Sequence, residues 1–182
     1  MISAWHPPRG RAVYSAPSPR HEVHSLPQAF AQALARMKPP LLLLLGPPAV
    51  CIDGKASPLT LRPKAVALLA YLALASREIT RSELARLLFP EAEAPLATLR
   101  WHLTHIRGRA PAFVSRALTA TGDRLALALG TDVAVFRAKA EAPCAHPEAR
   151  GLARTLALYR GDLVAGLTVS ASAEFDNWLY VE

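Results

Sequence analysis

The sequence predicts an α+β fold: a small N-terminal antiparallel sheet, three helices, a C-terminal β-hairpin and then a short all-helical segment. Three observations predict it. Short β-type runs flank the dipeptide Asp53-Gly54, and the apolar residues beyond Pro63 recur at helical spacing. A second turn, Gly122-Asp123, divides the next pair of β-type runs. At 182 residues the chain has room for one domain of ordinary size, or for a small domain with attachments.

The composition is that of a chain with a hydrophobic core. Hydrophobic residues make up 52% of it and charged residues 19%, so it is not disordered throughout. Two cysteines exclude the disulfide-rich secreted class and fit a reducing cytosol. No apolar run reaches the roughly 20 residues of a membrane-spanning helix, and residues 1–11 lack a signal-peptide stretch. We therefore expect a soluble, cytoplasmic protein that is not attached to a membrane.

Residues 1–40 are predicted to be a basic, Pro-rich leader, because 7 of the 16 prolines lie there. One short helix interrupts it at residues 28–37, where Phe30, Ala33 and Leu34 recur at helical spacing. Two interpretations of this helix stand. It packs on the next domain, or it is a weakly ordered extension.

The predicted sheet consists of three short strands at residues 41–45, 49–52 and 57–61. The Asp53-Gly54 turn joins the second strand to the third, as in a hairpin. Cys51 lies in the second strand and is expected to be buried and inert.

Three helices are predicted next. Residues 63–75 are apolar nearly all round, which indicates a central, buried helix. Residues 80–89 open with a capping box in which Thr80 and Glu83 satisfy each other's free amides. The third helix runs from residue 95 to 109.

The β-type runs 114–121 and 124–129 complete the pattern as a hairpin. Strands, helices and hairpin in this order predict a winged helix-turn-helix domain over residues 41–130. The helix at 95–109 is then the recognition helix, and the hairpin at 114–129 is the wing.

The third helix has an apolar face and an outward face. Leu96, Leu99, Leu103 and Ile106 are predicted to point inward, whereas the opposite face has small residues and cationic margins. Cations there suit the phosphates beside a groove. From the residues alone, the predicted DNA contacts are Arg100, Arg107 and Arg109 on the helix, with Arg116 or Arg124 on the wing.

Trp101 lies on the outward face and needs a partner. The wing or an N-terminal strand covers it, or it contacts DNA or a second subunit. His102 and His105 could share a metal, but no cysteine or acidic ligand is near in sequence, so groove contact or ordinary helix surface is favoured. No catalytic constellation and no phosphate-binding loop is present, so we expect neither an enzyme nor a cofactor.

Charge divides the chain into two parts. Residues 62–130 carry ten basic side chains against five acidic ones, whereas residues 131–182 carry five against seven. A basic middle and an acidic tail indicate two units with different partners.

Several motifs together resemble the SARP-type transcriptional activators. They are Leu43-Leu44-Leu45-Gly46-Pro47, Asp53-Gly54-Lys55, Arg62-Pro63-Lys64, the run Leu99 to Arg107, Asp132-Val133-Ala134-Val135-Phe136, Leu158 to Leu163 and Phe175 to Leu179. The resemblance implies an OmpR-type winged helix followed, over residues 131–182, by part of a helical, TPR-like bacterial transcriptional activation domain (BTAD). It also implies that Arg100, Trp101, Thr104, His105 and Arg107 touch bases or phosphates.

The predicted function is a sequence-specific regulator of transcription, an activator by resemblance, that binds double-stranded DNA. Its tail would contact RNA polymerase or a second copy of the chain. Leu152, Leu156, Tyr159 and Trp178 are expected to be partly exposed there, which favours a homodimer. The alternative is a winged-helix adaptor that docks on proteins or dimerises without reading DNA. Salt separates the two, because phosphate contacts weaken steeply as salt rises.

Overall fold

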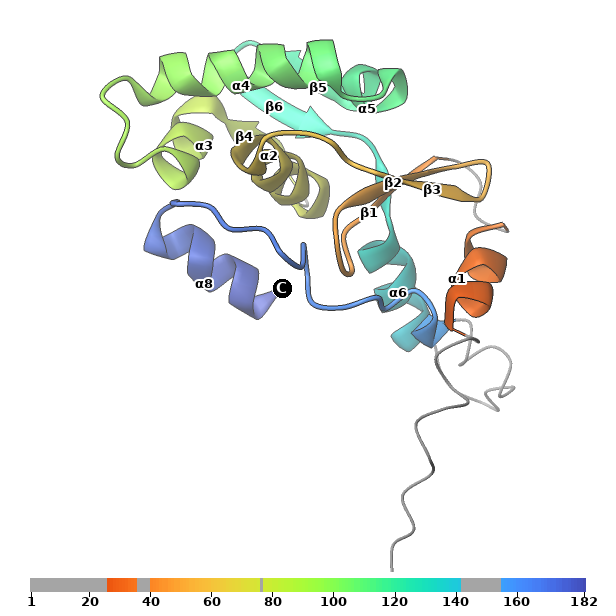
Figure 1. Ribbon diagram of the computed structural model, residues 1–182. Helices are drawn as coiled ribbons and strands as arrows, with labels where there is room; N and C mark the ends of the chain where they lie inside the picture. Colours follow the sequence, from red (N-terminus) through yellow and green to blue (C-terminus); the bar gives the residue numbers. More distant parts are fainter. Residues whose placement is uncertain (1–25, 36–39, 76, 142–154) are drawn as a thin grey trace, which may run out of the picture.

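The computed structural model describes residues 26–35, 40–75, 77–141 and 155–182. In these ranges the chain forms seven helices and two sheets, so the α+β class is confirmed (Figure 1). Most of the predicted Pro-rich leader lies outside the described residues. Among the helices that are described, none has the length and apolar character needed to cross a bilayer.

The first sheet has four strands in the order β3-β2-β1-β7, with β7 parallel to β1. They are β1 (Leu41–Leu43), β2 (Ala49–Ile52), β3 (Lys55–Pro58) and β7 (Gly130–Thr131). The prediction of 49–52 is confirmed, but the third strand lies earlier than the predicted 57–61. The reason is the two-residue turn: Asp53 and Gly54 both have positive φ, 49° and 75°, and pair Ile52 with Lys55.

Helix α1 (Leu26–Leu34) packs on this sheet, as the first of the two interpretations requires. Leu34 is buried in a cluster with Leu41, Leu43 and Cys51. The burial of Cys51 was predicted. The turn glycine allows this contact. A Cβ on Gly54 would lie 2.6 Å from the Cα of Ala35, so a side chain there would push the end of α1 away.

Helix α2 (Pro63–Leu74) lies at the centre of the molecule (Figure 1). Seven of its residues are buried, in agreement with its apolar sequence. Helices α3 (Arg81–Leu88) and α4 (Pro95–Arg109) pack against α2 and against each other. The bounds of α4 match the predicted ones.

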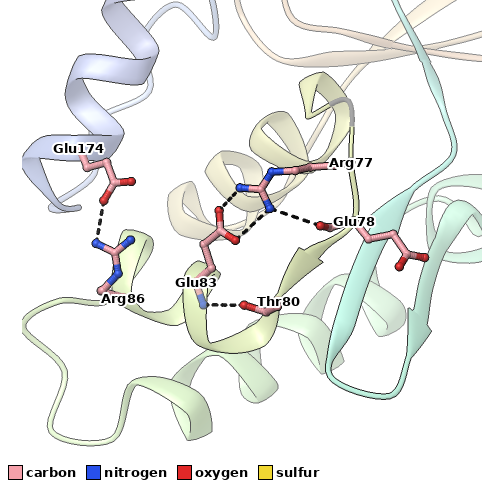
Figure 2. A network of polar contacts seen from close by, with 6 residues as sticks. All are labelled: Arg77, Glu78, Thr80, Glu83, Arg86 and Glu174. Carbon is pink, nitrogen blue, oxygen red and sulfur yellow. Dashed lines mark hydrogen bonds and ion pairs between the residues drawn. The ribbon is translucent and has the colours of Figure 1, made fainter.

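The capping box at the start of α3 is half confirmed. The Glu83 amide donates to Thr80 Oγ1 at 3.2 Å. The second bond of the box, from the Thr80 amide to the Glu83 carboxylate, is not formed. This carboxylate accepts two hydrogen bonds from the Arg77 guanidinium instead (Figure 2). A charged, forked donor is a stronger partner for a carboxylate than a single amide.

The second sheet has the order β4-β6-β5, formed by β4 (Ile79–Thr80), β5 (Leu118–Thr121) and β6 (Arg124–Leu127). The predicted hairpin is present but shorter than 114–129. Residues 112–117 form helix α5 (Ala112–Ala117), so Arg116 is not on the hairpin. The reason is local: the Pro111 carbonyl accepts from the amides of Val114 and Ser115, at 2.9 and 3.1 Å, which closes a helical turn.

The tail contributes α6 (Asp132–Ala140) and α8 (Ala173–Val181). Asp132 is fully buried and accepts from the amides of Leu44, at 2.7 Å, and Leu45, at 3.1 Å. Arg160 approaches the same carboxylate at 3.7 Å. Burial raises the pKa of the Asp132 carboxyl, and the amides and Arg160 oppose that rise. The amides of Leu44 and Leu45 donate to the Asp132 side chain and not to a strand, and β1 ends at Leu43 and not at the predicted Leu45.

The tail shares its core with the preceding helices. Phe175 of α8 is completely buried in the cluster that contains most of α2. The Ser172 amide donates to the Leu87 carbonyl at 2.9 Å, and Arg86 pairs with Glu174 at 2.7 Å, so α8 is joined to α3 (Figure 2). Of the tail residues expected to be partly exposed, Leu156 and Tyr159 are exposed by 56% and 50%, Trp178 is half-buried, and Leu152 lies outside the described residues.

We expect Asp132→Ala to lower the free energy of unfolding by about 3–5 kcal/mol, because it leaves the buried amides of Leu44, Leu45 and Val133, and Arg160, without their carboxylate partner. Chemical denaturation measures the change. Asp162→Ala is the matched control: among the described residues its exposed carboxylate accepts only from Tyr159, so we expect a loss of no more than about 1 kcal/mol. Equal losses in the two variants would contradict this account of the junction.

Candidate nucleic-acid interface

Helix α4 lies along one outer edge of the molecule (Figure 1). Leu99, Leu103 and Ile106 are buried in the core, as predicted. Leu96 is not: 52% of it is exposed, so its predicted inward orientation is wrong. It lies in the first turn of α4, where it lines a surface pocket that also includes Arg81 of α3.

His102 completes the buried face of α4, which the sequence analysis missed. Only 8% of it is exposed, and its ring stacks on Phe89 at 4.9 Å between centroids. Burial, followed by the charges of His105, Lys64 and Arg62, lowers the pKa of His102. A signal was available: residues 99, 102, 103 and 106 follow the spacing of an apolar helical stripe. Because histidine is polar, residue 102 was not counted as part of the apolar stripe.

The outer face of α4 presents Trp101, Thr104 and His105. Half of Trp101 is exposed, and its ring stacks on His105 at 5.4 Å with an interplanar angle of 6°. Thr104 is exposed and donates to the Arg100 carbonyl at 3.1 Å. Two covers were predicted for Trp101, the hairpin and an N-terminal strand. Among the described residues, neither makes a ring or cation contact with Trp101. The guanidinium of Arg62 lies over the ring instead, at 5.1 Å from its centroid.

One flank of this outer face is a cationic pocket. Arg100 and Arg107 of α4 and Arg81 of α3 surround a cavity of about 340 Å³ with Leu96, Leu103 and Thr104. None of the described residues that line it carries a carboxylate. Arg81 was not among the predicted contacts. Its amide donates to the Asp123 carbonyl at 2.8 Å, which holds the start of α3 beside the hairpin turn.

The remaining predicted contacts lie on three different elements. Arg109 is exposed at the C-terminal end of α4, and Arg124 is exposed at the start of β6. Arg116 is exposed on α5, between α4 and the hairpin.

Ion pairing distinguishes these cations from the others. The ion pairs found among the described residues involve Arg77, Arg86, Arg137 and Arg160, and three of the four partners, Glu174, Glu182 and Asp132, belong to the tail. None of them involves a predicted contact residue, or Arg62 or Arg81. The guanidinium groups around α4 are therefore available to an external anion.

Comparison with known proteins shows that this chain is similar in fold to a solved structure. No family model matches the sequence, and no curated protein matches it. Among solved structures, EmbR of Mycobacterium tuberculosis, in complex with a low-affinity phosphopeptide, superposes with a TM-score of 0.57 at 21% identity. The match covers 78% of this chain but 41% of EmbR, so this chain spans less than half the length of that protein. At this identity the likeness shows the fold alone.

The lowered pKa of His102 predicts loss of stability in acid. The unfolded chain takes up a proton as the pH falls below the ordinary histidine pKa near 6.5, whereas the buried ring resists it. Stability is thus retained above that pH and lost below it, by up to about 1.4 kcal/mol per pH unit. We expect His102→Leu to remove this part of the loss in denaturation measured at pH 7.5 and 5.5.

His105→Leu is the control, because that half-exposed ring lies outside the core. It should keep most of the acid-side loss of the parent protein, because burial is the largest cause of the lowered His102 pKa and the charge of His105 comes second. If the parent and His102→Leu lose the same stability between the two pH values, the buried imidazole is not its source.

Proposed function

We propose that this chain is a sequence-specific regulator of transcription that binds double-stranded DNA. The observation that carries the proposal is the outer face of α4: an exposed surface of Thr104, half of Trp101 and small residues, bordered by arginines without carboxylate partners among the described residues. An exposed helix with unpaired cations at its margins fits the major groove, where bases form the floor and phosphates the walls.

In this proposal residues 41–130 form a winged-helix domain. Helix α4 enters the major groove and the β5–β6 hairpin is the wing on the neighbouring backbone. Each predicted site residue has a place in it. Thr104, His105 and Trp101 face the bases; Arg100, Arg107, Arg109 and Arg124 bind phosphates or base edges, and Arg116 approaches the backbone from α5.

The fold shared with EmbR is compatible with this class of function. It agrees with the motifs that resemble the SARP-type activators. We propose accordingly that residues 131–182 are part of a helical activation domain and that the chain is an activator acting by binding, without catalysis. Its tail then contacts RNA polymerase or a second copy of the chain.

One observation favours the alternative, a protein-docking adaptor. Large apolar side chains of the tail are exposed, including Leu156, Tyr159 and Tyr180, the last at 91%. Exposed apolar groups of this kind suit a protein partner. The unpaired arginines lie on α4 and its surroundings and not beside these side chains, which is why we place DNA binding first.

Removal of a phosphate contact should weaken binding to a duplex and flatten its dependence on salt. We expect Arg100→Ala and Arg107→Ala each to reduce affinity roughly tenfold, in line with a lost charge-assisted hydrogen bond. Each should also lower the slope of log K against log salt by about 0.9. Fluorescence anisotropy with duplexes selected from a random library, at low and at physiological salt, measures both quantities.

Lys139→Ala removes an exposed charge from α6, away from α4, and should leave both quantities unchanged. Three outcomes would contradict the proposal: no duplex binding at low salt, affinity that does not respond to salt, or equal effects of Lys139→Ala and the arginine variants. The first outcome would favour the docking adaptor.

A further inference from the structure

The two flanks of α4 do not carry equal charge. With an advance of about 100° per residue, Arg100 and Arg107 lie on one side of the outermost line through Ala97, Thr104 and Gly108. Thr98, Trp101 and His105 lie on the other side, where Arg109 at the C-terminal end is the cation that α4 itself supplies. A helix in the major groove meets phosphates on both walls, so the second flank lacks cations over most of its length.

Arg62 occupies this second flank from outside α4. It is the N-cap residue of α2, and its guanidinium lies 5.1 Å from the centroid of the Trp101 ring. The residue is exposed and has no ion pair among the described residues. A charge held on an aromatic face keeps its outward hydrogen-bond donors free.

The backbone of Arg62 is fixed as well. Pro63 restricts the residue before it to extended conformations, and Arg62 has φ −62° and ψ 145°. Its carbonyl accepts from the amides of Ala65 and Val66, at 2.9 and 3.1 Å. Backbone and side chain are thus both ordered before any ligand binds, which lowers the entropy cost of a contact.

We propose that Arg62 is a further DNA-contact residue, which binds a backbone phosphate on the wall of the groove opposite Arg100 and Arg107. Trp101 is its positioning residue: one face of the indole holds the guanidinium at the edge of α4. This inference rests on the proposed function and extends the interface from α4 and the hairpin to the start of α2.

A double-mutant cycle tests the inference. Arg62→Ala should weaken duplex binding roughly tenfold, with little dependence on base sequence, and lower the salt slope by about 0.9. Trp101→Leu keeps an apolar side chain next to His102 but removes the ring that holds the guanidinium. The double variant should then bind no more weakly than Trp101→Leu alone, because Arg62 contributes only when the ring positions it. Circular dichroism melting confirms that each variant is folded.

Arg107→Ala in the same assay separates the two proposals. If Arg107→Ala weakens binding and Arg62→Ala changes neither affinity nor salt slope, Arg62 is not a contact, although the DNA-binding function stands. Multiplicative effects of Arg62→Ala and Trp101→Leu would show that the ring does not position Arg62. If the parent protein does not bind duplexes at low salt, both proposals are wrong.

Discussion

The buried inner face of α4 is the constraint on which the interface depends. Leu99, His102, Leu103 and Ile106 pack into the core formed with α2 and α3, and this fixes the rotation of α4 about its axis. Because one face of the helix is buried, the residues on the opposite face are necessarily exposed. Trp101 and Thr104 are at the surface because their neighbours in sequence are inside.

A second constraint joins the tail to this framework. The carboxylate of Asp132 accepts from the amides of Leu44 and Leu45, directly after β1, and Arg160 brings a distant part of the tail to the same place. Through Phe175 and the Arg86–Glu174 pair, α8 also rests on α3, which in turn packs on α4. These contacts connect the tail physically to the helices that carry the proposed interface.

Much of this architecture could be predicted from local sequence signals. Pro63 and Pro95 mark the starts of α2 and α4, Thr80 caps α3, and the Asp53-Gly54 turn places a hairpin. These signals act over a few residues, so they are visible in the sequence. The strands β4 and β7 were missed because two residues are too short for a period, and both exist only through pairing with distant strands.

The candidate site shows the same division. Spacing along one helix predicted which face of α4 is outward. It did not predict that His102 is buried in the core, where its ring stacks on Phe89 and its pKa is lowered. Nor could spacing on α4 reveal Arg62 or Arg81, because these come from other elements and reach α4 only in the folded chain. Arg116 was misplaced for a local reason, since Pro111 starts a helical turn where β-type residues suggested a strand.

Photo-cross-linking tests the central claim most directly. The photoreactive residue p-benzoylphenylalanine would replace Thr104 on the outer face of α4 or, in a second variant, Lys139 on α6, and each protein would be irradiated with random-sequence duplex DNA at low salt. The account predicts a covalent protein–DNA product from position 104 and none from position 139. Cross-linking at position 139 alone, or equal cross-linking at both, would show that α4 does not face the duplex.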